Sequence, residues 1–156
     1  DVLVYLNVAK GFRSGTFNTA AGIAAAGSIG LTVGQAVDPD SLWSYELGTK
    51  LAALDGRLLA EFAVYRFDWK DQQLNFDAGT TRTQVIVNAG DTVGTGVEYA
   101  FTWAPGPEGL TLQATGNLNS TEFDSLTDPR LFAATPNIAA GRQVASVPKQ
   151  THSLAA

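Results

Sequence analysis

The sequence predicts an all-β fold, in which antiparallel up-and-down strands form a section of a transmembrane β-barrel. Two stretches carry this prediction, because apolar residues alternate with small or polar ones along residues 97–103 and 109–123. A period of two gives a strand one apolar face and one polar face. In the second stretch the polar positions are hydroxyls and amides, with neither Lys nor Glu among them. This composition is typical of a strand between lipid and a water-filled lumen.

Turns of two kinds connect the predicted strands. The best-defined strands cover residues 41–54, 57–71, 84–104 and 110–124. An Asp55-Gly56 turn joins the first two into a hairpin, and the Pro- and Gly-rich residues 105–109 join the second two. Longer connections lie at residues 15–37, 73–83 and 125–141. Short turns that alternate with long loops indicate an outer-membrane barrel, whose periplasmic turns are short and whose external loops are long.

The length sets how much of a barrel is present. The 156 residues provide about six strands, fewer than the roughly eight of the smallest barrels. Both ends of the chain read as strand patterns, so we expect residues 1–156 to be a section of a larger barrel domain. No run approaches the ~20 apolar residues of a membrane helix, so any crossing has to be made by strands.

Composition excludes several classes of function. The formal net charge is −5 and the basic residues are scattered singly, which argues against a nucleic-acid partner. Cysteine is absent, so disulfides and thiolate metal sites are excluded. His152 and Ser153 are neighbours in a strand pattern and point to opposite faces, so they form no triad, and we expect His152 on the pore side or at the rim. The sequence predicts no catalytic residue, metal site or cofactor, and therefore no enzyme.

Three charged residues within strand patterns are expected to face the lumen. Counting by two places Glu46 and Lys50 opposite Tyr45, and Glu98 opposite Tyr99. A Lys in lipid near the midplane costs ~2–4 kcal/mol, so the lumen is the favourable side. These charges either balance one another and order the wall, or contact a plug or solute.

Two tryptophans are expected to mark the membrane interfaces. Trp69 precedes the long connection at 73–83, and Trp103 precedes the turn at 105–109. Because aromatic girdles lie at both edges of the apolar band of a barrel, we assign one tryptophan to each end of the strands.

Glycine leads to two further expectations. Residues 22–34 contain four glycines, each of which costs a helix interior about 1 kcal/mol, so we expect a flexible loop with a helical turn near Ala24. Glycines within strand patterns are expected to relieve curvature, and these are Gly48, Gly90, Gly94 and Gly96.

Several motifs resemble one protein family. Tyr5 and residues 9–18 resemble the Y-x-x-x-A-x-G-F-R-x-G-x-F-N segment of TonB-dependent outer-membrane receptors. Pro39-Asp40, followed by Tyr-Glu-Leu-Gly-Thr-Lys at 45–50, resembles the family's P-E-x-x-x-x-Y-E-x-G-x-K, with Asp40 where Glu is usual. Further similarities are the N-A-G…G-V-E pattern at 88–98 and the Pro-containing start of the next strand at 147–149.

The resemblance implies a barrel of about 22 strands in the outer membrane of a Gram-negative bacterium, closed by an N-terminal plug and energised through TonB. Such receptors import ferric siderophores, haem, cobalamin or oligosaccharides. Residues 1–156 would then be a partial barrel domain without the plug. The implied partners are outer-membrane lipid, a small-molecule solute, and the plug and TonB by way of the missing N-terminal part.

The long external loops are expected to bind the solute. Aromatic and Arg side chains near loop bases suit anionic iron chelates and sugars, because they offer stacking and cationic contacts. The candidates are Phe17, Phe76, Arg82 and Phe132.

Two alternative interpretations have no transport cycle. One is a section of a plugless porin-type barrel, since both barrels have polar interiors. The other is a soluble β-sandwich binding module, in which residues 97–103 bury their apolar face against a second sheet.

Overall fold

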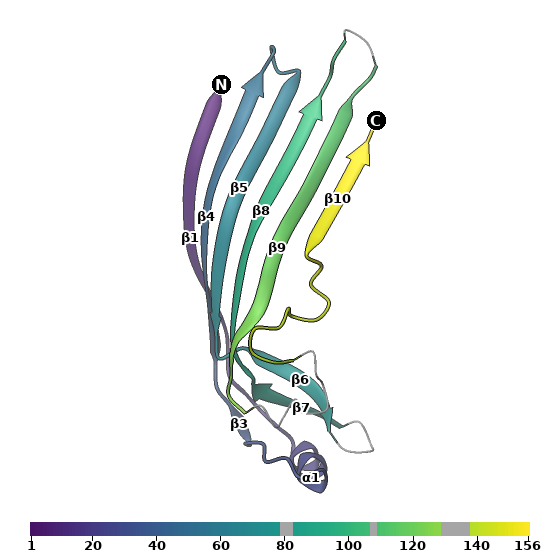
Figure 1. Cartoon of the computed structure of the whole chain (residues 1–156). Helices are drawn as coiled ribbons and strands as arrows, with labels where there is room; N and C mark the ends of the chain where they lie inside the picture. The colour runs from purple at the N-terminus through teal and green to yellow at the C-terminus, as the bar shows by residue number, and fades with distance from the viewer. Residues whose placement is uncertain (79–82, 107–108, 129–137) are drawn as a thin grey trace.

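The computed structural model describes residues 1–78, 83–106, 109–128 and 138–156. Six strands form one antiparallel sheet in the order β1-β4-β5-β8-β9-β10 (Figure 1). Their bounds are β1 Val2–Arg13, β4 Asp40–Ala53, β5 Leu58–Lys70, β8 Gly90–Trp103, β9 Leu112–Leu126 and β10 Gln150–Ala155. Each strand pairs with the next member of the sheet along the chain, which confirms the predicted up-and-down, all-β architecture.

The Asp-Gly turn forms as predicted. Asp55 and Gly56 have φ angles of 56° and 82°, and the Arg57 amide donates to the Leu54 carbonyl at 3.1 Å. Positive φ at both central residues is the requirement of the tight hairpin turn for which this dipeptide is suited.

The register gives the sheet one apolar and one polar face. Directly paired residues point to the same side of a sheet. One such row is apolar across five strands and consists of Leu6, Leu47, Val64, Val97 and Leu118. A neighbouring row on the opposite face consists of Tyr5, Gly48, Ala63, Glu98, Asn117 and Thr151.

The β-sandwich alternative is wrong. In a sandwich the apolar face of β8 would be buried against a second sheet, yet Phe101 and Trp103 are each 44% exposed. Apart from two isolated bridges, the other pairings among the described residues form two short two-stranded sheets.

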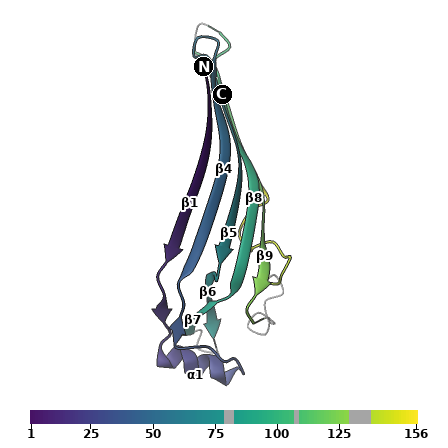
Figure 2. The same ribbon diagram turned by 90° about the vertical axis from the view of Figure 1, so that its left-hand side faces the viewer.

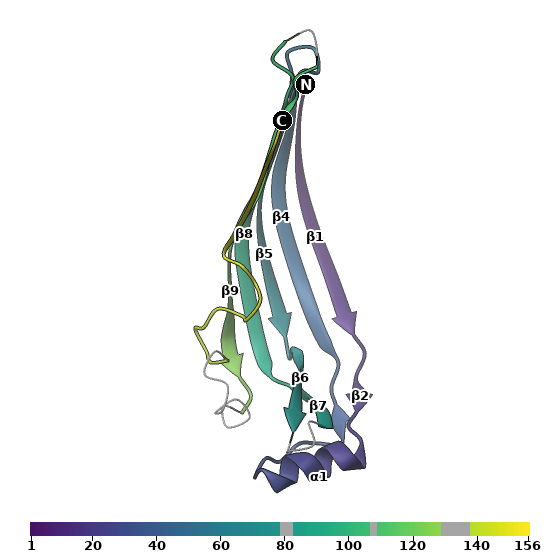
Figure 3. The same ribbon diagram turned by 90° about the vertical axis from the view of Figure 1, so that its right-hand side faces the viewer.

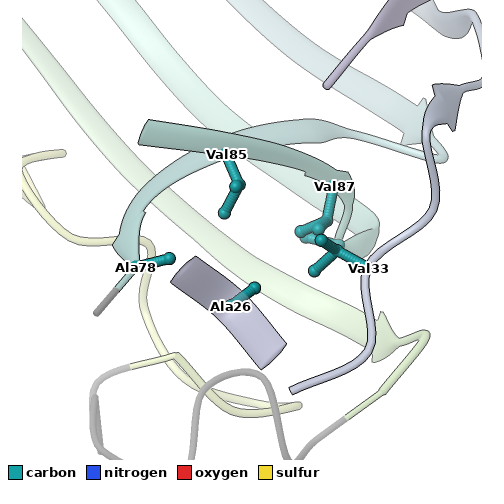
Figure 4. Close-up of a cluster of buried hydrophobic side chains, with 6 residues drawn as sticks. Ala26, Val33, Ala78, Val85 and Val87 are labelled. Atoms are coloured by element: carbon teal, nitrogen blue, oxygen red, sulfur yellow. The ribbon is translucent and has the colours of Figure 1, made fainter. Parts of the chain in front are cut away.

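A small second layer lies at one end of the sheet, away from both chain termini (Figures 2 and 3). It comprises β2 Thr16–Phe17, α1 Ala20–Ser28, β3 Ala36–Val37, β6 Gln73–Ala78 and β7 Thr83–Asn88. Its buried cluster, much of which Figure 4 labels, consists of Ala26, Val33, Ala78, Val85, Val87 and Ala89. We call this unit the loop layer, because its segments are the long connections between β1 and β4 and between β5 and β8.

The expectation of a flexible loop at 22–34 is wrong, because α1 occupies much of it. The Thr19 hydroxyl caps the helix by accepting from the Gly22 amide at 3.1 Å. Gly22 and Ala26 are buried, and their small size lets the helix approach β7 closely. Packing of the loop layer thus outweighs the unfavourable helix propensity of glycine.

The predicted strand 84–104 and the predicted loop 73–83 also need correction. Residues 73–78 form β6, which pairs with β7. Ala89 then separates β7 from β8, so residues 84–104 form two strands and not one. Gly90 has a φ of 137°, and its carbonyl accepts from the Gln72 amide at 2.7 Å. This conformation favours glycine and turns the chain from the small β6–β7 sheet into the large one.

No helix in the described ranges is long and apolar enough to cross a membrane.

Candidate functional site

The structure places Glu46, Lys50 and Glu98 on the polar face of the sheet. Lys50 Nζ lies 3.0 Å from Glu61 Oε2, so these two charges form an ion pair. Glu46 accepts a hydrogen bond of 2.6 Å from the Tyr5 hydroxyl, and Glu98 accepts one of 2.8 Å from Asn117 Nδ2. Because Lys50 balances Glu61, the carboxylates of Glu46 and Glu98 are left with neutral donors in the part of the chain that the structure describes.

Glycines on the polar face make room for aromatic rings from neighbouring strands. Tyr5 lies across Gly48, and Tyr65 lies across Gly96, each ring directly opposite its glycine in the register. A Cβ at either glycine would run into the ring. The sequence led us to expect that these glycines relieve curvature. The register shows that they also make room for an aromatic ring on the neighbouring strand.

The ring of Phe67 uses Gly94 in the same way. Beside these rings runs a chain of polar groups on β9. Asn117 Nδ2 also lies 3.2 Å from the Tyr65 hydroxyl, Asn119 donates to Asn117 at 3.1 Å, and Thr121 donates to Asn119 at 3.3 Å. The polar face is therefore a connected hydrogen-bond network.

Trp69 and Trp103 lie on opposite faces of the sheet, so the two cannot both belong to a girdle on the apolar face. Trp69 shares the polar face with Arg13, whose guanidinium carbon lies 4.9 Å from the centre of its ring. The aromatic group at this end of the apolar face is Trp43, which stacks on Tyr45 with ring centres 6.3 Å apart. Counting by two from Tyr45 would have found it.

Asp40 joins the sheet to the loop layer. Its side chain is only 1% exposed, accepts hydrogen bonds from Arg13 Nε at 2.9 and 3.1 Å, and forms an ion pair with that guanidinium. The Gln73 amide of β6 donates to the same carboxylate at 2.9 Å. Burial opposes ionisation of Asp40, but the donors on Arg13 and Gln73 outweigh it and hold the pKa of the carboxyl below its ordinary value.

Two asparagines fix the segments of the loop layer to one another. The Asn18 side chain donates to the carbonyl of Ile86 and accepts from its amide, both at 2.8 Å. Asn88 exchanges a similar pair of 2.9 Å hydrogen bonds with the backbone of Asp38. Side chains that pair with backbone groups on separate connections hold the loop layer as one unit.

The predicted solute contacts have different surroundings. Phe17 on β2 is 73% exposed. Phe76 on β6 is partly buried against the core of the loop layer. Arg82 and Phe132 lie outside the described residues.

His152 is on the apolar face, so of its two expected positions, the pore side and the rim, the first is wrong. It is paired with Gly116, which is itself paired with Tyr99. The Tyr99 hydroxyl and His152 Nδ1 are 2.9 Å apart, and this hydrogen bond satisfies one polar atom of each side chain. No group of three or more metal-ligating side chains occurs among the residues with described positions.

Comparison with known proteins identifies a family with this fold. The family model described as "TonB dependent receptor-like, beta-barrel" matches residues 1–156. The chain is 33% identical over 123 residues to the pesticin receptor of Yersinia pestis. The aligned region covers 79% of this chain and 16% of that receptor. The fold is similar to the crystal structure of the ferric yersiniabactin uptake receptor FyuA from Yersinia pestis, with a TM-score of 0.68 and 24% identity. That match covers 97% of this chain and 20% of the solved one.

The chain therefore spans a fifth or less of the length of either receptor. The family match over all 156 residues and the two-faced antiparallel sheet lead to one conclusion. This chain belongs to the TonB-dependent receptor family and corresponds to part of its β-barrel.

Proposed function

We propose that this chain is a wall segment of an outer-membrane transporter that uses TonB to import a scarce solute into a Gram-negative bacterium. The observation that carries the proposal is the family match along the whole chain. The name of one relative, a ferric yersiniabactin uptake receptor, favours a ferric siderophore as the solute. Haem, cobalamin and oligosaccharides are the other classes of solute to test.

The two faces of the sheet support an orientation in the membrane. The apolar face would contact lipid, with Trp103 near the short turns and Trp43 near the loop layer. Lys10 Nζ lies 5.3 Å from the centre of the Trp43 ring, a cation–aromatic contact suited to the polar interface. The loop layer is then external, and the polar face lines the lumen.

The polar face would contact the plug. Glu46 and Glu98 offer carboxylates that no described cation of the wall balances. Contacts to TonB belong to other parts of the whole receptor.

Uptake by cells tests the proposal directly. The full-length receptor is expressed in a Gram-negative strain without its own siderophore receptors, and accumulation of iron-loaded siderophores, haem or cobalamin is measured with and without TonB. Saturable, TonB-dependent uptake of one class is the expected result. Unselective, TonB-independent entry of small polar solutes would instead indicate the porin alternative.

Phe17 is the exposed aromatic residue of the loop layer that we assign to solute binding. Phe17→Ala is expected to weaken solute binding by about 1–3 kcal/mol, the usual effect of truncating an aromatic side chain that stacks on a ligand. Phe12→Ala is the matched control, because Phe12 is 77% exposed but lies on the apolar face of the sheet. Binding to the purified receptor is measured by titration, and equal affinities of the two variants would contradict the assignment.

A further inference from the structure

Two tyrosines on the polar face form hydrogen bonds with a carboxylate or with an amide that itself binds a carboxylate. The Tyr5 ring crosses Gly48 and brings its hydroxyl to Glu46 Oε1 at 2.6 Å. The Tyr65 ring crosses Gly96 and brings its hydroxyl within 3.2 Å of Asn117 Nδ2, which in turn donates to Glu98 at 2.8 Å. The arrangement of a ring over a glycine thus occurs twice, with a direct hydrogen bond from Tyr5 to Glu46 and an indirect link from Tyr65 through Asn117 to Glu98.

This arrangement fixes a carboxylate without neutralising it. A hydroxyl or amide donor orients one carboxylate oxygen, whereas a Lys or Arg in its place would also cancel the charge. Lys50 does cancel the charge of the neighbouring Glu61, with which it pairs at 3.0 Å. Among the described residues of the polar face, the ion pairs Lys50–Glu61 and Arg13–Asp40 therefore differ from Glu46 and Glu98, whose carboxylates are oriented but not neutralised.

The glycines make this orientation possible. With a Cβ at Gly48 or Gly96, the ring would have to leave the surface of the sheet, and its hydroxyl would move away from its present partner. Glycine ordinarily weakens a strand. At these two positions that local cost is offset by the placement of the tyrosine hydroxyl.

We propose that Tyr5 and Tyr65 are positioning residues, which orient Glu46 directly and Glu98 through Asn117, so that both carboxylates bind cationic side chains presented from inside the barrel. The inference rests on the proposed function, in which those side chains belong to the plug. Removing one hydroxyl then loosens the plug, although the ring still covers its glycine.

The test is the KCl conductance of the full-length receptor in planar lipid bilayers, because a loosened plug opens the water-filled lumen to ions. Tyr5→Phe is compared with Glu46→Gln and with the double variant. We expect Tyr5→Phe to raise the frequency of opening about tenfold, the scale of one hydrogen bond to a charged group. The double variant is expected to open no more often than Glu46→Gln alone, because the hydroxyl acts through that carboxylate.

Tyr99→Phe is the matched control. Tyr99 also lies across a glycine, Gly116, and its hydroxyl also has a hydrogen-bond partner, but on the apolar face. We expect this variant to open as rarely as the wild type. The thermal unfolding of the barrel is measured for every variant, so that a purely structural role of Tyr5 is recognised by a lower unfolding temperature without extra opening.

Three outcomes separate the possibilities. A Tyr5→Phe receptor that opens no more often than the Tyr99→Phe receptor overturns the inference, and so do additive effects of Tyr5→Phe and Glu46→Gln. A wild-type receptor that conducts steadily overturns the proposed function itself. The second pair, Tyr65→Phe with Glu98→Gln, repeats the test independently if Tyr5→Phe does not insert into the membrane.

Discussion

Asp40 is the residue at which the sheet and the loop layer meet. Its buried carboxylate collects donors from the last residue of β1 and the first residue of β6. A buried carboxylate is tolerated only when such donors are present, and removing its charge leaves the partners without their acceptor. Ionisation of this one side chain therefore contributes to the attachment of the loop layer.

The pKa of Asp40 is lower in the folded protein than its ordinary value of 3.8. Its stabilising contribution is therefore fully present above that value and is lost as the pH falls through the lower, folded pKa. We expect hydrogen exchange of the β6 and β7 amides to accelerate below about pH 4 in the wild type. Asp40→Asn should remove about 1.5–3 kcal/mol of protection at neutral pH and flatten this pH dependence.

Asp68→Asn is the control for this measurement. Asp68 pairs with Arg66 at 2.6 Å, but the two side chains are 33% and 55% exposed. An exposed pair contributes at most about 1 kcal/mol, so its loss should leave the loop layer unchanged. Equal effects of the two substitutions would show that Asp40 has no special role.

At the scale of residues, the alternation of side chains predicts which residues lie on the polar face. The position of a residue along its strand does not predict its face. The shared face of Glu46, Lys50 and Glu98 follows from counting by two. The place of Trp69 near a strand end suggests a girdle, although the same count puts it with Tyr65 on the polar face. The ring-over-glycine contacts depend on the register of strands joined by long connections, where no tight turn fixes the pairing in advance.

Helix α1 illustrates how packing decides an element that propensity disfavours. Gly22 faces β7, where an added Cβ would lie 2.8 Å from Val85 Cγ1 and 3.2 Å from the Gln84 carbonyl oxygen. At Gly27 an added Cβ would meet nothing within 4 Å. The two glycines therefore differ in function, one allowing close approach and the other only weakening the helix.

This difference gives opposite expectations for one chemical change. Gly27→Ala should stabilise α1 by up to about 1 kcal/mol, because alanine is the better helix former. Gly22→Ala should destabilise the loop layer by about 1–3 kcal/mol through overpacking, despite the same gain in propensity. Hydrogen exchange of the α1 amides in the full receptor measures both, and a shift of the same sign in both variants would contradict the packing of α1 on β7.

At the scale of elements, the long sheet was predictable and the loop layer was not. Strands β4, β5, β8 and β9 correspond to predicted strands because each has a strong period of two and a tight turn. β6, β7 and α1 have weak local signals, and their stability comes from the shared cluster around Val85. Such contacts between distant segments override local propensity.

At the scale of the whole molecule, the apolar face and the two edges of the sheet are exposed, as expected for a section of a larger barrel. The apolar face carries many exposed large side chains, among them Leu47, Val64 and Leu118. Exposed apolar area of this extent marks a membrane or protein interface. Strands β1 and β10 are the edges of the six-stranded sheet, and a bare edge favours pairing with a further strand. Both features agree with a wall segment of a larger barrel.

The most direct test of a barrel wall labels the two faces of the sheet in the full receptor, reconstituted in lipid. Single nitroxide labels are placed on the apolar face at Leu47, Val64 and Leu118, and on the polar face at Thr115 and Ser153. Collisions with oxygen, which concentrates in lipid, are compared with collisions with a water-soluble nickel complex. We expect oxygen to dominate at the first three positions and nickel at the other two. Equal accessibility on both faces, or nickel dominating on the apolar face, would contradict a wall with lipid on one side and the lumen on the other.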